Sequence, residues 1–176
     1  MTRIEFIKGD ITQIDTEAIV NAGNIHLSNG SGVNGAIHRA AGPDLDEECR
    51  AIEGNPRCPT GEARITGGYN LPAEYIIHTV GPVYRGGNNG EAELLYNSFY
   101  NSLSLAVEKG IKTIAFPAIS TGVFSYPHRE AAEISVSAVK DFIGKHSDAF
   151  ERIVFVLFSD EIYRIFKEQG EDSGLL

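Results

Sequence analysis

Apolar residues recur along the chain with two different periods, and the two kinds of segment alternate. Short stretches that are alternating or continuously apolar predict strands, and they are residues 3–8, 18–21, 62–66, 75–80, 112–116 and 153–158. Longer stretches with apolar residues at helical spacing predict amphipathic helices, and they are residues 33–41, 43–52, 91–109, 128–143 and 160–168. Residues 11–16 are expected to form only a turn or a short helical piece.

This order of elements predicts an α/β fold in three layers, α/β/α. Strands that alternate with helices pair mostly in parallel, and the helices cover both faces of a central sheet, here of about six strands. A chain of 176 residues fits a single domain on this plan. We expect residues 1–170 to form that domain and residues 171–176 to be a frayed C-terminal tail.

The loops that follow the strands carry the polar and glycine-rich segments. In largely parallel sheets, ligands bind at the carboxyl ends of the strands, near the point where the strand order reverses. Asp10, Asn21, Pro117 and Phe158 each stand at such an end. We therefore expect their loops to meet at one edge of the sheet.

The loop after Asn21 has the composition of an anion site. Gly30, Gly32 and Gly35 allow successive backbone N–H groups to converge, and the helix that follows adds its unpaired first-turn N–H groups. Phosphate is the expected anion. The letters also match the GxGxxG dinucleotide fingerprint, but about eight residues separate Asn21 from Gly30, which is too long for the tight turn of that motif.

A second candidate anion loop spans residues 120–126, between a predicted strand and a predicted helix. It contains no lysine or arginine, and its hydroxyl groups, such as those of Ser120 and Thr121, and its backbone N–H groups can hold a phosphate. The alternative is a hydroxyl-rich turn that caps the helix starting near His128. Two such loops at strand ends support an anion site better than either one alone.

Several side chains near these loops have both a structural and a functional interpretation. Asp10 is either a turn residue or an acceptor for an adenine amino group or a sugar. Phe124 and Phe158 either pack in the core or stack on a sugar or base. His38 and His78 stand among apolar residues and are interpreted as core histidines with satisfied hydrogen bonds rather than as catalysts.

The sequence contains no serine elbow, zinc-type histidine pair or Walker lysine, so it is silent on covalent catalysis and on metals, and we assign no metal and no cofactor. Cys49 and Cys58, nine residues apart, match no metal or redox spacing and are expected to be reduced thiols. The net charge of −9 disfavours general binding to nucleic-acid backbones. Without a signal-peptide core or an apolar run of about 20 residues, the chain is expected to be a cytoplasmic protein with no membrane association, and a monomer by default.

Four motifs, in order, resemble the signature of the macrodomain family in its MacroD-type branch. They are Gly9-Asp-Ile-Thr12, Asn21-Ala-Gly-Asn24, Gly32-Val-Asn-Gly-Ala-Ile-His-Arg-Ala-Ala-Gly42 and Pro117-Ala-Ile-Ser-Thr-Gly-Val-Phe-Ser-Tyr-Pro127. The resemblance extends over nearly the whole chain. It implies a three-layer α/β/α fold that binds ADP-ribose. It also implies a metal-independent enzyme that removes ADP-ribose from acidic side chains and deacetylates O-acetyl-ADP-ribose.

The resemblance further implies roles for single residues and for partners. Asp10 would hold the adenine amino group, residues 32–35 and 120–124 would wrap the diphosphate, and Asn24 would bind the distal ribose and orient the scissile group. The partners would be ADP-ribose, its derivatives and mono-ADP-ribosylated proteins. Together with the loops above, the expected ligand-binding residues are Asp10, Ile11, Asn21, Gly32, Val33, Gly35, Ser120, Thr121, Gly122, Val123, Phe124 and Phe158. The expected catalytic residues are Asn24 and Asn34.

Asn34 is the departure from the family pattern that bears most on function, because the family places its catalytic aspartate there. A carboxamide donates and accepts hydrogen bonds but cannot take a proton near neutral pH, and losing a general base costs ~10²–10⁴-fold in rate. We therefore expect an attenuated hydrolase. Three accounts stay open: hydrolysis through a water positioned by Asn24 and Asn34 and deprotonated by the ligand's own phosphate, a noncatalytic ADP-ribose reader, or a substitution introduced to trap a complex.

Overall fold

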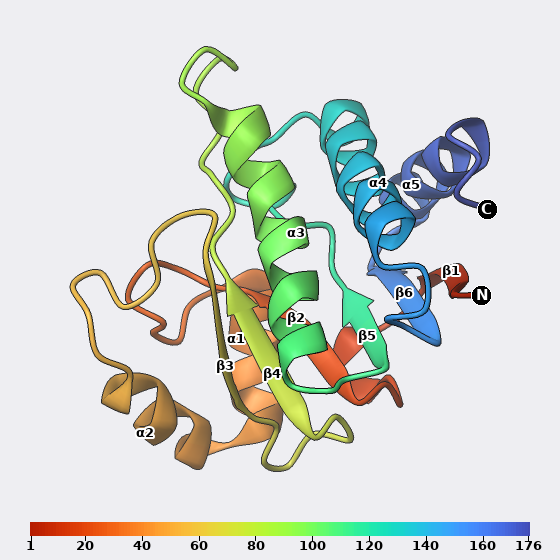
Figure 1. The fold of residues 1–176 in the computed structure, drawn as a ribbon. Coiled ribbons are helices and arrows are strands. Elements are labelled where there is room, and N and C mark those ends of the chain that lie inside the picture. Colours follow the sequence, from red (N-terminus) through yellow and green to blue (C-terminus); the bar gives the residue numbers. More distant parts are fainter.

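The strands form one sheet that runs through the middle of the molecule (Figure 1). The structure, a computed structural model, describes residues 1–176. The strands are β1 (Arg3–Lys8), β2 (Ala18–Ala22), β3 (Ala63–Gly67), β4 (Tyr75–Thr79), β5 (Thr113–Phe116) and β6 (Arg152–Leu157). The helices are η1 (Ile11–Gln13, a 3₁₀ turn), α1 (Gly32–Ala41), α2 (Pro43–Ala51), α3 (Glu91–Glu108), α4 (His128–Lys145) and α5 (Asp160–Asp172).

The order of strands across the sheet is β1-β6-β5-β2-β4-β3, and all neighbouring pairs are parallel except β3 with β4. The predicted α/β fold with a mostly parallel sheet of six strands is thus confirmed. β3 and β4 are antiparallel because residues 68–74 turn the chain straight back, with no crossover helix between the two strands.

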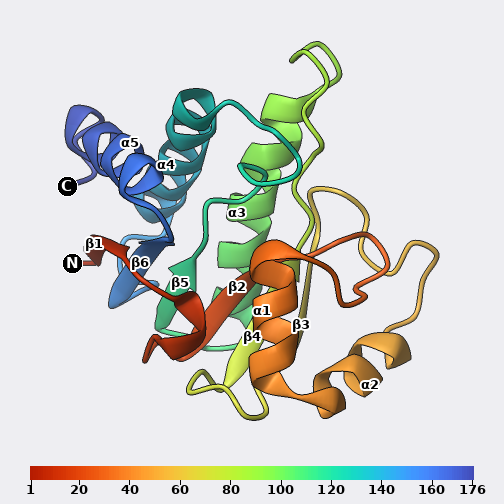
Figure 2. The same cartoon turned by 180° about the vertical axis from the view of Figure 1, so that it is seen from behind.

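Helices cover both faces of the sheet, α3, α4 and α5 on one face and α1 and α2 on the other (Figures 1 and 2). Alternation along the strands sends Val20 and Ile77 to the first face and Ile19 and Ile76 to the second. Two buried apolar clusters result, of 25 and 15 residues, so each face of the sheet has its own core. No helix combines the length and the apolar character that crossing a membrane requires.

The strand order reverses between β2 and β5. Their pairing is confined to Ala18 with Ile114 and Ile19 with Ala115, although both strands continue beyond these residues. The helix after β2 lies on one face of the sheet and the helix after β5 on the other, so the two following loops separate here. This is where a sheet of this type leaves room for a ligand.

The predicted end of the last helix at Glu168 is wrong, because α5 continues to Asp172. Gly170 lies buried inside this helix, where a Cβ would come 2.6 Å from Cε1 of Phe6. The glycine therefore allows close packing of α5 against β1 instead of ending the helix. After the helix, the backbone N–H groups of Leu175 and Leu176 both donate to the Gly170 carbonyl oxygen, at 3.0 and 3.1 Å.

Candidate functional site

A cavity of about 750 Å³ opens at the carboxyl ends of β1, β2, β5 and β6, a volume that suits a small-molecule ligand. Most of the predicted site residues line it, and these are Asp10, Ile11, Gly32, Val33, Asn34, Ser120, Thr121, Gly122, Val123, Phe124 and Phe158. Three predicted residues lie outside its wall: Asn21, Asn24 and Gly35. The loops expected to meet at one edge of the sheet therefore do so.

The N-terminal turn of α1 forms one wall of the cavity. The backbone N–H groups of Gly32, Val33 and Asn34 have no hydrogen-bond partner in the protein, and the cap residue of the helix gives no side-chain bond. At the next residue, a Cβ on Gly35 would come 2.5 Å from the Gly30 carbonyl oxygen, so this glycine lets the preceding loop pack against the helix. The wall presents unpaired donors at the positive end of a helix dipole, which favours an anion.

The hydroxyl groups of the second loop are bonded to the protein itself. Ser120 has a φ of +69°, and its Oγ donates to the Pro82 carbonyl oxygen at 2.8 Å. The Thr121 hydroxyl donates to the Ala118 carbonyl oxygen at 2.7 Å. Helix α4 begins after Pro127 without a side-chain cap. The interpretation of these hydroxyls as a helix cap is therefore wrong.

The second loop instead presents backbone donors to the cavity. The N–H groups of Gly122, Val123 and Phe124 have no partner in the protein, and all three residues line the cavity. Two runs of unpaired N–H groups, one from each loop, thus border the same space. Such groups bind the oxygens of a phosphate or diphosphate without a basic side chain.

The loop between β4 and α3 supports this second wall, although no motif in the sequence points to a function for it. A Cβ on Gly81 would lie 2.2 Å from Oγ of Ser120, so only glycine leaves room for the strained serine. The backbone N–H of Tyr84 donates to the Phe124 carbonyl oxygen at 2.9 Å. The two loops are therefore joined at both ends of the segment of residues 120–124.

A single carboxylate holds the shape of that supporting loop. The side chain of Glu91 accepts hydrogen bonds from the backbone N–H groups of Arg85, Gly87 and Asn89, at 2.7, 3.0 and 2.6 Å. These bonds, the one from Arg85 most of all, lower the pKa of Glu91 to about 2. Glu91 therefore stays ionised over the whole pH range in which the protein would work.

Acidic, basic and aromatic groups lie at the β1 and β6 end of the cavity. Oδ1 of Asp10 accepts from the N–H and the hydroxyl of Thr12, at 2.9 and 2.7 Å, so its interpretation as a turn residue is confirmed, while Oδ2 has no partner. Lys8, the one basic residue in the lining, forms an ion pair with Asp160 at 2.9 Å. Phe158 is 73% exposed, so core packing is the wrong interpretation for it.

Asn34 and Asn24 are joined through one backbone carbonyl. Nδ2 of each donates to the Ser28 carbonyl oxygen at 3.0 Å. Oδ1 of Asn24 accepts from the backbone N–H groups of His26 and Ser28, at 3.0 and 3.1 Å. Oδ1 of Asn34 accepts from Nδ2 of Asn21, at 2.9 Å. Asn21 is therefore buried behind Asn34 and does not face the cavity.

Both histidines are buried, as the sequence predicts. His78 is fully buried, with its two ring nitrogens 3.1 Å from Nδ2 of Asn21 and 2.9 Å from Oγ1 of Thr66. Burial, with a smaller contribution from the nearby His38, lowers the pKa of His78 to about 3. His38 binds Asp46 through Nδ1 at 2.6 Å, whereas its Nε2 is buried without a partner. Satisfied hydrogen bonding is thus confirmed for His78 and only half true for His38.

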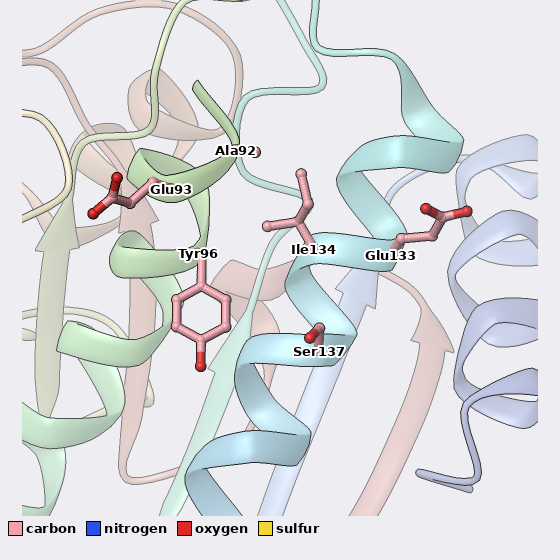
Figure 3. Close-up of a pocket in the computed structure, with 6 residues that line it drawn as sticks. All are labelled: Ala92, Glu93, Tyr96, Glu133, Ile134 and Ser137. Carbon is pink, nitrogen blue, oxygen red and sulfur yellow. The ribbon is translucent and has the colours of Figure 1, made fainter. Parts of the chain in front are cut away.

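A second, shallower cavity of about 420 Å³ lies between α3 and α4. Figure 3 shows Tyr96 and Ile134 over the groove, with the carboxylates of Glu93 and Glu133 directed away on opposite sides. Its walls are the first turns of α3 and one side of α4. No three His, Cys, Asp or Glu side chains anywhere in the structure are placed to hold a metal ion.

An α/β protein with two backbone-lined anion loops at its switch point belongs, as a class, with proteins that bind nucleotide-like phosphate ligands. The family model named Macro domain matches residues 20–135. The chain belongs to the macrodomain family, which confirms the resemblance of its motifs.

Three known proteins show how close the relationship is. An O-acetyl-ADP-ribose deacetylase of Escherichia fergusonii is 49% identical over 176 residues, which cover 97% of this chain and 99% of that protein. An ADP-ribose glycohydrolase of Xenopus laevis is 48% identical over 168 residues, which cover 95% of this chain and 40% of that protein. The structure of an Oceanobacillus iheyensis macrodomain with ADP is similar with a TM-score of 0.89 and 42% identity, covering 96% of this chain and 90% of that one.

Proposed function

We propose that the protein binds ADP-ribose and hydrolyses ADP-ribose esters, namely mono-ADP-ribosylated acidic side chains of proteins and O-acetyl-ADP-ribose. The observation that carries the proposal is the pair of backbone N–H walls around one cavity, which matches a diphosphate. Family membership supports it, as do two relatives, one named for deacetylation of O-acetyl-ADP-ribose and the other an ADP-ribose glycohydrolase.

In this proposal the ligand lies across the cavity. The diphosphate sits between residues 32–34 and 120–124, where its oxygens accept from the unpaired N–H groups. The adenine lies at the β1 and β6 end, because the free Oδ2 of Asp10 can accept from its amino group and the exposed ring of Phe158 can stack on it. The distal ribose lies toward Phe124 and Asn34.

Hydrolysis then requires a water molecule and a group that takes its proton. The water oxygen adds to the ester carbonyl carbon, and the bond from that carbon to the ribose oxygen breaks, giving a carboxylic acid and a free ribose hydroxyl. Asn34 positions the water from the cavity wall, and Asn24 supports it from behind through the shared Ser28 carbonyl oxygen. The ligand's own phosphate takes the proton of the water and passes it to the departing ribose oxygen. Because Asn34 cannot act as the base, we propose that turnover is slow, on the scale of ~10²–10⁴-fold for a lost general base.

The test compares the rate at which the protein hydrolyses two substrates with its affinity for ADP-ribose. Purified protein is incubated with a peptide carrying ADP-ribose on a glutamate, and separately with O-acetyl-ADP-ribose, while calorimetry measures the affinity for ADP-ribose. Slow release of free ADP-ribose is the expected result. Tight ADP-ribose binding without turnover of either substrate would leave the second candidate, a noncatalytic ADP-ribose reader, which the absence of a carboxylate at Asn34 favours.

As a further part of the proposal, the protein acts in the cytoplasm as a monomer. The two cysteines, Cys49 and Cys58, are buried free thiols, which is typical of a reducing compartment. Light scattering of the purified protein measures the oligomeric state, and a stable dimer at micromolar concentration would contradict the monomer.

A further inference from the structure

A chain of hydrogen bonds leads from Asn34 away from the cavity to the far edge of the sheet. Asn21 on β2 is the register partner of His78 on β4, and Thr66 on β3 stands diagonally from His78, opposite Ile76. Side chains two residues apart on a strand share a face, so the three polar groups lie in a row under α1 and α2. All three are at most 2% exposed, so water does not compete for these bonds.

The direction of the bonds is fixed at the cavity end by the Ser28 carbonyl, which can only accept. The Asn34 carboxamide must turn its Nδ2 toward this oxygen, at 3.0 Å, and its Oδ1 therefore points inward. That oxygen in turn requires a donor from Asn21, whose Nδ2 lies at 2.9 Å. Asn21 thus presents its amino group, not its oxygen, to Asn34.

The Gly67 carbonyl at the other end of this row of bonds can accept the Thr66 hydroxyl proton, which is consistent with the same direction. The Thr66 hydroxyl donates to this oxygen at 3.1 Å, so its own oxygen accepts from Nε2–H of His78 at 2.9 Å. A neutral ring protonated at Nε2 leaves Nδ1 as an acceptor, and Nδ2 of Asn21 lies 3.1 Å from it. The Ser28 end therefore requires this orientation of Asn21, and the Thr66 end is consistent with it.

This arrangement leaves Oδ1 of Asn21 buried without a partner, but no other one keeps the bond from Asn34 to the Ser28 carbonyl oxygen. A proton on Nδ1 of His78 would point at the amino group of Asn21, and the only remedy is to turn over both carboxamides, which breaks the bond to Ser28. The titratable groups that face His78 are His38, at a ring-centre distance of 6.4 Å, and Cys49, whose sulfur lies 4.0 Å from Nε2. Neither supplies an acceptor for a charged imidazolium.

We propose that Thr66, His78 and Asn21 are positioning residues that lock the Asn34 carboxamide with its oxygen inward and one N–H toward the cavity. Asn34 lines the cavity, and its second N–H has no partner in the protein. The side chain therefore meets the ligand as a donor and recognises an acceptor oxygen on it, such as a ribose, phosphate or ester carbonyl oxygen. The identity of that ligand, an ADP-ribose derivative, rests on the proposed function, whereas the orientation of Asn34 does not.

The first test needs no ligand. Nitrogen-15 NMR of the unmodified protein at pH 7 reports which ring nitrogen of His78 carries the proton. We expect a neutral ring protonated at Nε2, together with slow exchange of the Asn34 side-chain N–H that donates to the Ser28 carbonyl oxygen. A ring protonated at Nδ1, or an imidazolium, would overturn the proposal whether or not the protein turns over any substrate.

The second test removes Thr66, the last residue in the row of hydrogen bonds that starts at Asn34. Thr66→Val keeps the shape but deletes the acceptor for His78, so the ring proton is expected to divide between the two nitrogens and the affinity for ADP-ribose to fall about three- to tenfold. Thr66→Ser restores the hydroxyl and should return the His78 signals and the affinity to within about twofold of the original protein.

The matched control is Thr79→Val, at a fully buried threonine on β4 whose hydroxyl donates to the Glu62 carbonyl oxygen at 2.8 Å, outside the chain. It loses a buried bond of the same kind, so it should lower stability while leaving the His78 signals and the ADP-ribose affinity unchanged. Equal effects of Thr66→Val and Thr79→Val on affinity would reduce Thr66 to a structural role. If the unmodified protein does not bind ADP-ribose at all, the proposed function fails, and the His78 proton position still decides the inference.

Discussion

Replacing Asn34 by aspartate should speed hydrolysis at least tenfold, as the balance of two effects. The carboxylate can take a proton from water, which is worth ~10²–10⁴-fold. Against this, it cannot donate to the Ser28 carbonyl oxygen, which Nδ2 now reaches at 3.0 Å. Losing that bond costs about 1 kcal/mol, which lowers the population of the conformation with Ser28 held against residue 34 by roughly a factor of five. The bond from Asn21 remains and gains strength because its acceptor is charged.

The measurement is the initial rate of ADP-ribose release from the glutamate-linked peptide and of acetate release from O-acetyl-ADP-ribose. Asn34→Ala is the control, because it loses the bond to Ser28 without gaining a base, and it should be no faster than the original protein. The affinity of Asn34→Asp for ADP-ribose should fall at the same time, since a carboxylate replaces a donor. An unchanged or lower rate, with ADP-ribose still bound, would refute the general-base argument and place the base elsewhere.

Three further predictions follow from the geometry. Asp10→Ala should weaken ADP-ribose binding by about 1.5–3 kcal/mol, the range for a charge-assisted hydrogen bond, and calorimetry showing no loss would remove Asp10 from the site. Gly35→Ala places a Cβ 2.5 Å from a backbone oxygen of the preceding loop and should lower the affinity at least about tenfold, whereas Gly144→Ala, with no atom within 4 Å, should leave it unchanged. The Glu91 pKa is lowered from 4.5 to about 2, so its contribution to stability is complete above pH 4.5 and is lost as the pH falls toward 2. Hydrogen exchange at residues 85–89 should accelerate in that window, and Glu91→Gln should show the fast exchange already at pH 7. Unchanged protection of these residues in Glu91→Gln would contradict the role given to the carboxylate.

The spacing of apolar residues in the sequence is sufficient to locate the strands and helices, because the buried face of each one has its own local period. This spacing does not tell whether a strand runs parallel or antiparallel to its neighbour. β3 is antiparallel to β4 because the short connection between them has no helix. The predicted end of the C-terminal helix at Glu168 is wrong for a related reason. Gly170 appears as a helix stop in the sequence, while its contact with Phe6, far away in the chain, explains why it is tolerated inside the helix.

The candidate site was predictable where it depends on the backbone of a single loop. The glycine-rich loop and residues 120–124 line the cavity as expected. Asn21 was misplaced because its burial depends on the pairing of β2 with β4, which is invisible in one segment. The inward turn of the Ser120 hydroxyl likewise depends on Gly81 and Pro82, about forty residues earlier. Side-chain direction, not residue type, was the missing information.

A phosphate site made of backbone N–H groups has a consequence for competition in a crowded cell. Fixed dipoles attract over short distances, so their pull depends on the shape of the ligand and only weakly on ionic strength. A cleft lined with lysine and arginine side chains would instead attract any polyanion at long range. With a net charge of −9, this protein repels nucleic acids and polyphosphates at long range, while a small diphosphate that fits between the two loops still gains every hydrogen bond. In the proposed site, selectivity against abundant anions thus comes from backbone N–H groups, because the one basic side chain in the lining, Lys8, is paired with Asp160.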